Sequence, residues 1–294
     1  MATDRQGARR TEHGIGPFVT WALSRSGGGA PRLQTSRRLR KGLRSLPVAA
    51  GAASPDLAEP APRHDWLRLW MPARLGWWIA VLFMIGSALF ALGGLRAAAP
   101  HLPWLGWLGA AAINPVFFAG SLVFTAAAYL QFYEALNGDI SAPQAPRRYV
   151  GWRPRNLAYL ASAVQLLGTL LFNRSTGDAL LAGLGWWEQD LLVWKPDMTG
   201  CLCFLVSSQL AIMEFAHGWF AFRPGRLAWW IVMVNMLGSI LFLLAGLASF
   251  VDPRGAVIAP LPANAGTVAG SLCFLLGAYL LIPEQAEAPR RKAA

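Results

Sequence analysis

Three glutamates end a fifteen-residue pattern that occurs three times without a gap. The three copies are GSLVFTAAAYLQFYE (120–134), GCLCFLVSSQLAIME (200–214) and GSLCFLLGAYLLIPE (270–284), which end on Glu134, Glu214 and Glu284. An ionisable side chain in a long apolar segment is costly and by default suggests a function. The chemistry open to these carboxylates is proton or cation binding, or an ion pair that fastens one helix to another.

Each glutamate is expected at the C-terminal end of a helix, where the macrodipole disfavours an anion and a cationic partner is needed. Arginines stand near the start of the following apolar segment. The predicted partners are Arg153 or Arg155 for Glu134, Arg223 or Arg226 for Glu214, and Arg74 for Glu284 if the chain closes into a ring. We therefore predict a structural clamp of ion pairs, with a proton or cation site as the alternative.

Long apolar helices must position these carboxylates. The 294-residue chain is 55% apolar and contains fourteen tryptophans, which is typical of a membrane protein. About 20 helical residues cross the hydrocarbon core. Six segments are predicted to do so, at about 75–95, 114–134, 156–173, 198–217, 226–250 and 264–284, the third being the shortest. The predicted fold is all-α, a polytopic bundle of six transmembrane helices.

The odd-numbered segments repeat as well as the even ones. They align as WMPARLGWWIAVLFMIGSALF (70–90), WRPRNLAYLASAVQLLGTLLF (152–172) and FRPGRLAWWIVMVNMLGSILF (222–242). A repeat of this length indicates one structural unit used several times. We predict three helical hairpins, at 63–138, 147–217 and 218–284, followed by a tail at 285–294.

A smaller motif runs through all six segments: Gly, then Ser, Thr or Cys, and Phe four residues after the Gly. Its glycines are Gly86, Gly120, Gly168, Gly200, Gly238 and Gly270. Small residues allow lipid-embedded helices to approach closely, so we predict a tight packing layer at one depth. The neighbouring hydroxyls either line a polar passage or bond to carbonyls one turn back. These hydroxyls belong to Ser87, Ser121, Thr169, Ser239 and Ser271.

The paired segments with Gly-Ser-x-x-Phe in each resemble the YrhK-like domain, a small bacterial two-crossing membrane domain with no established activity. The resemblance implies three tandem copies between Trp66 and Glu284, in a bacterial inner membrane. It implies no catalytic residues. The second copy departs most from the pattern, with Asn156 in place of Arg and Cys201 in place of Ser.

Residues 1–62 are rich in Arg, Gly, Ser, Ala and Pro, include RRLRKGLR at 37–44, and show no apolar periodicity. We predict a disordered basic arm, suited to anionic lipid headgroups and less suited to nucleic acid. Lys and Arg divide 22 to 4 between the two sides of the six segments, the arm included. By the positive-inside rule, both termini are predicted to be cytoplasmic and the protein to lie in the plasma membrane.

No HExxH, GxSxG, CxxC or phosphate-binding glycine loop occurs in the sequence. We therefore expect no catalytic residues, no cofactor and no metal. We predict a non-enzymatic scaffold, sensor or membrane-organising protein, able to form a homo-oligomer. The alternative is a small transporter or channel with a Gly-Ser constriction and carboxylates on the cytoplasmic side. A cavity that joins Gln165, Asn235 and the hydroxyls to Glu214 favours transport, whereas an axis filled by Leu and Phe argues against it.

Overall fold

The computed structural model describes residues 2–3, 9–25, 30–48, 64–141 and 145–286. Six long helices dominate it: α2 (Leu75–Ala98), α3 (Ile113–Asn137), α4 (Leu157–Asp178), α6 (Lys195–Ala216), α7 (Leu227–Ala248) and α8 (Pro260–Gln285). Short helical segments precede two of them: η2 (Pro103–Leu105), η3 (Ala110–Ala112), α5 (Trp186–Glu188) and η4 (Gln189–Trp194). The six helices lie where the sequence predicted them, with ends that differ by a few residues.

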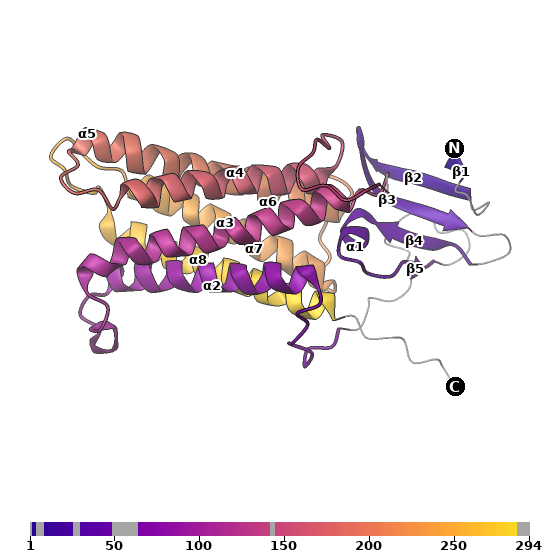
Figure 1. Cartoon of the computed structure of the whole chain (residues 1–294), viewed down its shortest axis with the longest axis horizontal. Helices are drawn as coiled ribbons and strands as arrows, with labels where there is room; N and C mark the ends of the chain where they lie inside the picture. The colour runs from indigo at the N-terminus through magenta and orange to yellow at the C-terminus, as the bar shows by residue number, and fades with distance from the viewer. Residues whose placement is uncertain (1, 4–8, 26–29, 49–63, 142–144, 287–294) are drawn as a thin grey trace.

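The six helices form a closed ring. Each packs against the next along the chain, and α8 returns to pack against α2. Consecutive helices run in opposite directions, so α2, α4 and α7 begin at the end of the bundle where α3, α6 and α8 finish (Figure 1). We call this the arm end, because the N-terminal arm lies against it, and the opposite one the far end. Three hairpins therefore surround one axis.

Five of the described helical segments are long and apolar enough to cross a membrane: Leu75–Ala98, Ala110–Asn137, Trp186–Ala216, Leu227–Ala248 and Pro260–Gln285. A multi-pass membrane protein follows from them. Helix α4, predicted as the third crossing, is not among the five. Its last six residues, Asn173 to Asp178, include Arg174 and are mostly polar, which shortens its apolar run.

Six phenylalanines close the middle of the axis. Phe90, Phe172 and Phe242 touch one another with ring centroids 6.1–6.3 Å apart. Phe124, Phe204 and Phe274 form a second triangle, at 5.7–6.4 Å. Within each hairpin one ring of each triangle contacts the other, at 5.8, 5.0 and 5.2 Å. We call these six rings the phenylalanine barrier.

The motif glycines make room for these rings. A Cβ on Gly86 would lie 2.4 Å from the Phe124 ring, and a Cβ on Gly270 would lie 2.5 Å from the Phe242 ring. The other four glycines meet the partner helix of their own hairpin in the same way, at 3.0–3.1 Å. In each hairpin, the motif glycine of one helix therefore makes room for the motif phenylalanine of the other helix.

The neighbouring hydroxyls mostly bond within their own helices. Ser121, Thr169, Ser239 and Ser271 each donate to a carbonyl three or four residues earlier, at 2.7–3.0 Å. All four side chains are buried. These four hydroxyls therefore bond to the preceding turn, which is one of the two predicted roles. Among the four, Ser239 alone also lines a cavity described below.

The described residues of the N-terminal arm are folded, so the prediction of disorder is wrong for them, and residues 1, 4–8, 26–29 and 49–62 lie outside the described part of the chain. Five antiparallel strands follow in chain order: β1 (Ala2–Thr3), β2 (Arg9–Ile15), β3 (Phe18–Arg25), β4 (Arg32–Thr35) and β5 (Leu46–Pro47). A short helix, α1 (Ser36–Arg40), continues directly from β4 and is capped by the Thr35 hydroxyl, which accepts from Arg38 N at 3.2 Å.

A small apolar core stabilises this sheet. Trp21, Leu33 and Val48 are buried together, and His13 stacks on Trp21 with ring centroids 4.1 Å apart. Residues 16 and 17 connect β2 to β3 in a two-residue turn, with Gly16 at a positive φ of 53°. Glycine at the first position of such a turn is typical of hairpins. The sheet orients α1, which extends from it into the bundle.

Candidate functional site

Glu134, Glu214 and Glu284 converge at the arm end of the bundle. They belong to the last turns of α3, α6 and α8, which alternate around the ring with the first turns of α2, α4 and α7. All three residues are buried, with 7%, 2% and 5% of their surface exposed. Burial of three like charges requires positive charge close by.

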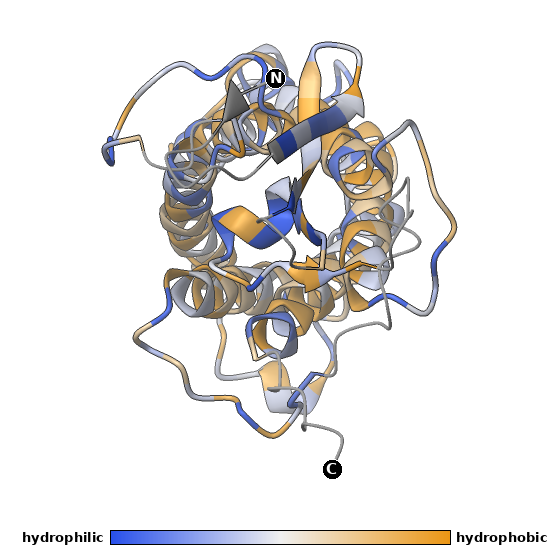
Figure 2. Cartoon of the chain, turned by 90° about the vertical axis from the view of Figure 1, so that its right-hand side faces the viewer, coloured by the Kyte–Doolittle hydropathy of each residue, from blue (hydrophilic) through white to orange (hydrophobic). Residues whose placement is uncertain are grey.

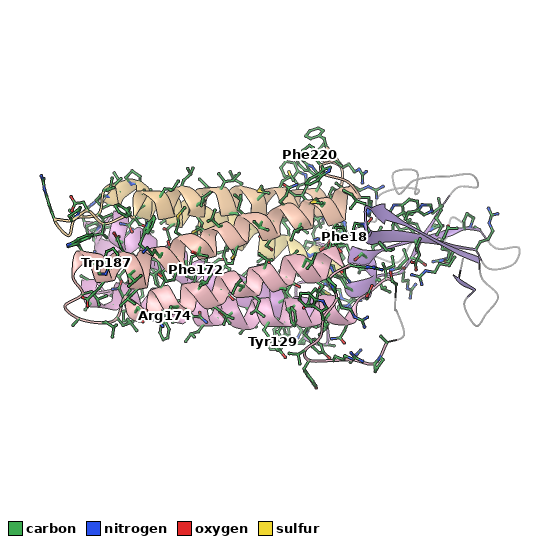
Figure 3. All side chains as sticks on the ribbon, turned by 90° about the horizontal axis from the view of Figure 1, so that it is seen from above. Phe18, Tyr129, Phe172, Arg174, Trp187 and Phe220 are labelled. Atoms are coloured by element: carbon green, nitrogen blue, oxygen red, sulfur yellow. The ribbon has the colours of Figure 1, made fainter. Side chains whose placement is uncertain are left out.

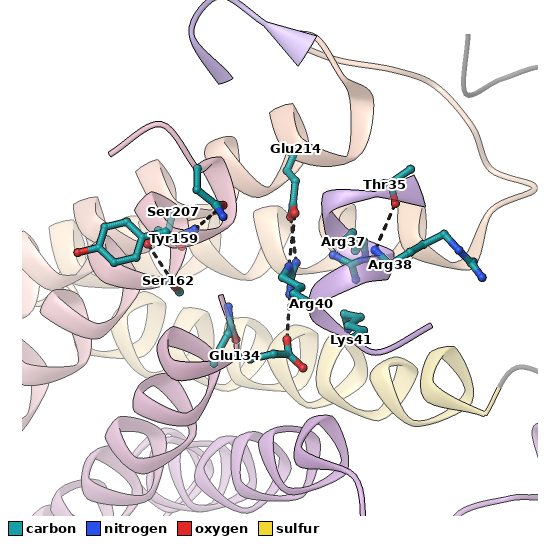
Figure 4. Close-up of polar contacts among 12 residues, drawn as sticks. Thr35, Arg37, Arg38, Arg40, Lys41, Glu134, Tyr159, Ser162, Ser207 and Glu214 are labelled. Carbon is teal, nitrogen blue, oxygen red and sulfur yellow. Dashed lines mark hydrogen bonds and ion pairs between the residues drawn. The ribbon is translucent and has the colours of Figure 1, made fainter. Parts of the chain in front are cut away.

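Helix α1 supplies that charge from inside the ring (Figure 2). Arg40 lies between two of the carboxylates (Figure 4): its Nη1 donates to Glu134 Oε2 at 3.1 Å, and its Nη2 donates to Glu214 Oε2 at 2.9 Å. Its Nε also approaches Glu214 Oε1 at 3.4 Å. One guanidinium therefore joins α3 to α6, which belong to different hairpins.

Two further cations serve the third carboxylate. Arg37 donates from Nε and Nη2 to the two oxygens of Glu284, at 2.7 and 3.0 Å, and Lys41 Nζ donates to Oε2 at 2.6 Å. Two-pronged arginine–carboxylate contacts of this kind are among the stronger ion pairs in proteins. Arg37, Arg40 and Lys41 follow the i, i+3, i+4 spacing that places side chains on one helical face.

The charges of this cluster balance, with three carboxylates against three cations. Burial acts to lower the pKa of Arg40, but the attraction of Glu214 and then of Glu134 outweighs it, so the pKa of Arg40 is raised. For Lys41 burial is the stronger influence and lowers its pKa, although Glu284 opposes this. We refer to Arg37, Arg40 and Lys41 as the plug cations.

The predicted clamp is therefore wrong in its partners. The ion pairs that the described residues form with the three glutamates come from the arm and not from the arginines beside each helix. Arg153 pairs with Asp139 at 3.8 Å, and Arg74 Nη1 donates to the Gln285 carbonyl at 2.8 Å. Arg155 is exposed. Arg223 lies 5.7 Å from the centre of the Phe215 ring, and Arg226 is the N-cap residue of α7.

A polar cavity of about 100 Å³, here named the arm-side cavity, lies between the plug cations and the phenylalanine barrier. Its polar lining comprises Gln131, Gln165, Ser207, Ser208, Asn235 and Ser239, together with Glu134 and Glu214. Gln131 donates to Gln165 at 3.1 Å, and Ser208 bonds to Ser239 at 2.8 Å. The cavity thus joins Gln165, Asn235 and one motif hydroxyl, that of Ser239, to Glu214, and Phe124, Phe204 and Phe274 also line it.

A larger cavity of about 510 Å³ lies on the other side of the barrier and is here named the far cavity. It is lined by the three remaining barrier rings, Phe90, Phe172 and Phe242, and by residues near the far ends of the helices. The axis therefore carries a cavity at each side and a filled aromatic section between them. The condition that favours transport is met in part, because Ser239 is the one motif hydroxyl among the residues that line the arm-side cavity. The condition that argues against transport, an axis filled by apolar side chains, is met at the phenylalanine barrier.

Comparisons with known proteins return no match: no family model, no curated protein and no solved structure is similar to this chain. The resemblance to the YrhK-like domain stays a prediction.

Proposed function

We propose that the protein is a small membrane transporter or channel for cations, described here in a closed state. The observation that carries this proposal is the order of features along one axis. Three carboxylates and a polar cavity lie at the arm end, six phenylalanines fill the middle, and a second cavity lies at the far end. Rings of carboxylates select cations, and apolar constrictions close pathways to ions.

In this proposal the plug cations occupy the cation site in place of a transported ion. Their side chains are at most 10% exposed, and each lies within 3.1 Å of a carboxylate oxygen. Hydrated cations would replace them only after α1 left the ring. The arm thereby acts as an internal inhibitor, and only its remaining cations are available for anionic lipid headgroups.

The membrane arrangement is part of the proposal. All six helices cross the bilayer, including α4, which exposes Leu167 and Leu170 by 52% and 50% on the outer surface of the ring. The other five helices expose equivalent aliphatic side chains, including Ile85, Leu122, Leu202, Leu237 and Leu272. The 22 to 4 division of Lys and Arg then places the arm, the plug and the C-terminus in the cytoplasm and the chain in the plasma membrane.

Three copies of one hairpin account for the symmetry of the axis. The reciprocal Gly–Phe contacts within each hairpin support the repeat. In the first and third copies, the paired tryptophans also donate to equivalent carbonyls: Trp77 to Leu69, Trp78 to Pro72, Trp229 to Ala221 and Trp230 to Pro224, at 2.8–3.0 Å. The YrhK-like assignment is proposed on the same motifs.

A second candidate is a non-enzymatic scaffold or sensor. The folded sheet favours it, because the sheet projects beyond the end of the bundle and is suited to contact another protein (Figure 1). Both candidates are non-enzymatic. They differ in whether ions ever cross the phenylalanine barrier.

Cation flux into liposomes separates the two candidates. We expect the full-length chain to be nearly closed to K⁺, and the triple variant Arg37→Gln/Arg40→Gln/Lys41→Gln to carry K⁺ at least about tenfold faster. The physical reason is that the freed carboxylates attract cations and stabilise hydrated ions at the inner entrance. Chloride flux should stay at background in both proteins.

The matched control is Arg147→Gln/Arg148→Gln/Arg153→Gln. It removes the same charge near the same end of the bundle but touches none of the three glutamates, and we expect it to stay closed. Adding Glu134→Gln/Glu214→Gln/Glu284→Gln to the plug variant should abolish the gain. Transport would be refuted if the folded plug variant were as impermeable as the wild-type protein.

A further inference from the structure

The far cavity contains a carboxylate that the site at the arm end does not use. Asp197 lies in the first turn of α6 and is the single charged residue among those that line this cavity. Within the described part of the chain it forms no ion pair and accepts no hydrogen bond from another residue. Asp197 is half-buried, and a carboxylate that is partly removed from water without a partner is costly, so a ligand that supplies positive charge would be favoured here.

Helix α7 packs closely against Asp197, because the residue at the contact is a glycine. Gly246 of α7 faces it, and a Cβ on Gly246 would lie 3.4 Å from Asp197 Oδ2, 3.2 Å from Met198 Sδ and 3.5 Å from Cys201 Sγ. The nearby polar hydrogens already have partners. Trp194 Nε1 donates to the Gly246 carbonyl at 2.8 Å, and Cys201 Sγ donates to the Phe242 carbonyl at 3.4 Å.

The same holds for the other donors whose bonds the structure gives around this cavity. Asn114, Thr176, Gln189, Ser249 and Thr267 all donate to backbone carbonyls, at 2.7–3.1 Å. Thr176 Oγ1 also bonds to Ser121 Oγ at 2.9 Å, whereas among the described residues the structure gives no second bond for the side-chain oxygens of Asn114, Gln189, Ser249 and Thr267. A cavity with one negative charge and several side-chain oxygens matches a ligand that brings N–H donors and positive charge.

The walls of the far cavity also favour a ligand that has an apolar part. Five aromatic rings line the cavity: Phe90, Phe117, Phe172, Trp194 and Phe242. Aromatic faces attract cations and also bury apolar carbon. A volume of about 510 Å³ falls in the range of pockets for small organic molecules and far exceeds what a bare metal ion needs.

We propose that the far cavity binds a small organic ammonium ion, with its protonated amine at Asp197 and its apolar body against the aromatic rings. This inference rests on the proposed function, for which it names the class of substrate. Binding and transport are separate measurements, so either can fail without the other. If an organic ammonium ion binds but no variant carries K⁺, the binding site is supported and the transport pathway is refuted.

Isothermal titration of the purified full-length protein in lipid nanodiscs tests the site. The probes are 2-phenylethylammonium and its neutral counterpart 2-phenylethanol, which share a ring and a chain length. We expect the ammonium probe to bind at least about tenfold more tightly than the alcohol, because only the ammonium pairs with Asp197. Asp197→Asn should remove this preference and leave the affinity for the alcohol unchanged.

Asp252→Asn is the matched control. Asp252 lies in the loop between α7 and α8 at the same end, accepts from Arg254 N and Ala256 N at 2.9 Å, and does not line the cavity. It should retain the wild-type preference. The two probes are also compared on the wild-type protein, so this part of the test does not depend on whether a variant folds. Equal affinities for them, absence of binding by the ammonium probe, or an unchanged preference in folded Asp197→Asn would each overturn the proposal.

Discussion

Replacing Arg40 with glutamine is expected to destabilise the protein by about 3–5 kcal/mol, the range measured when one partner of a buried ion pair is removed. Arg40 is the cation shared by Glu134 and Glu214, and the three side chains are 9%, 7% and 1% exposed. The variant would leave two buried carboxylates without their ion-pair partner. Chemical unfolding in detergent micelles, followed by circular dichroism, measures the difference.

Arg153→Gln is the control for this prediction. It also removes one arginine near the arm end, but its contact to Asp139 is 3.8 Å long and its side chain is 29% exposed. Pairs of this kind contribute about 1 kcal/mol or less. In the double variant Arg40→Gln/Glu214→Gln, part of the lost stability should return, because one unpaired anion is removed. Equal losses for Arg40→Gln and Arg153→Gln would contradict the assignment of Arg40 as the central cation.

Removing one ring of the phenylalanine barrier is the second substitution with a large expected loss of stability. Phe172 is 4% exposed and contacts Phe90, Phe204 and Phe242 with ring centroids 5.0–6.3 Å apart. In lipid, helix association gains little from the hydrophobic effect, so the cost of Phe172→Ala comes mainly from the void. At about 24 cal/mol per Å³, a void of roughly 100 Å³ costs about 2 kcal/mol.

Phe220→Ala tests whether this loss depends on position. Phe172 lies within the bundle, whereas Phe220 projects from its surface near the arm end and is 61% exposed (Figure 3). We expect a change below about 0.5 kcal/mol for Phe220→Ala, as is usual for surface substitutions. The same unfolding measurement applies to both. A neutral Phe172→Ala would mean that the six rings do not form a packed barrier.

The helical part of the fold was predictable because it rests on local patterns. Apolar length located the six helices, and the motif spacing placed Gly86 and its counterparts at close helix contacts. The role of the motif phenylalanines was missed, since the spacing shows that each Phe follows its Gly by four residues but not which helix that Phe meets. The reciprocal contact appears only when the two helices of a hairpin are antiparallel and in register.

The arm was missed for a different physical reason. Its strands are short, its cations are frequent, and its stability depends on a few buried residues such as Trp21 and Leu33. One signal was available: residues 16 and 17 form a two-residue Gly-Pro turn between apolar residues. The composition of the run at 37–44 favours disorder, although three of its cations share the face of one short helix.

The partners of the glutamates could not be derived from sequence proximity. Sequence neighbours such as Arg153 and Arg226 were the natural candidates, yet Arg40 is separated from Glu214 by 174 residues and Arg37 from Glu284 by 247. The burial of the carboxylates also does not follow from their position at helix ends, because the arm covers them and leaves at most 7% of their surface exposed.

The central claim is that the arm closes the carboxylate site, and chemical labelling of carboxylates tests it most directly. The full-length protein in nanodiscs is treated with a water-soluble carbodiimide and an amine, and the labelled residues are identified by mass spectrometry. We predict that Glu134, Glu214 and Glu284 stay unlabelled while exposed Glu188 is labelled, and that all four are labelled in Arg37→Gln/Arg40→Gln/Lys41→Gln. Labelling of the three glutamates in the wild-type protein to the same extent as Glu188 would contradict the account.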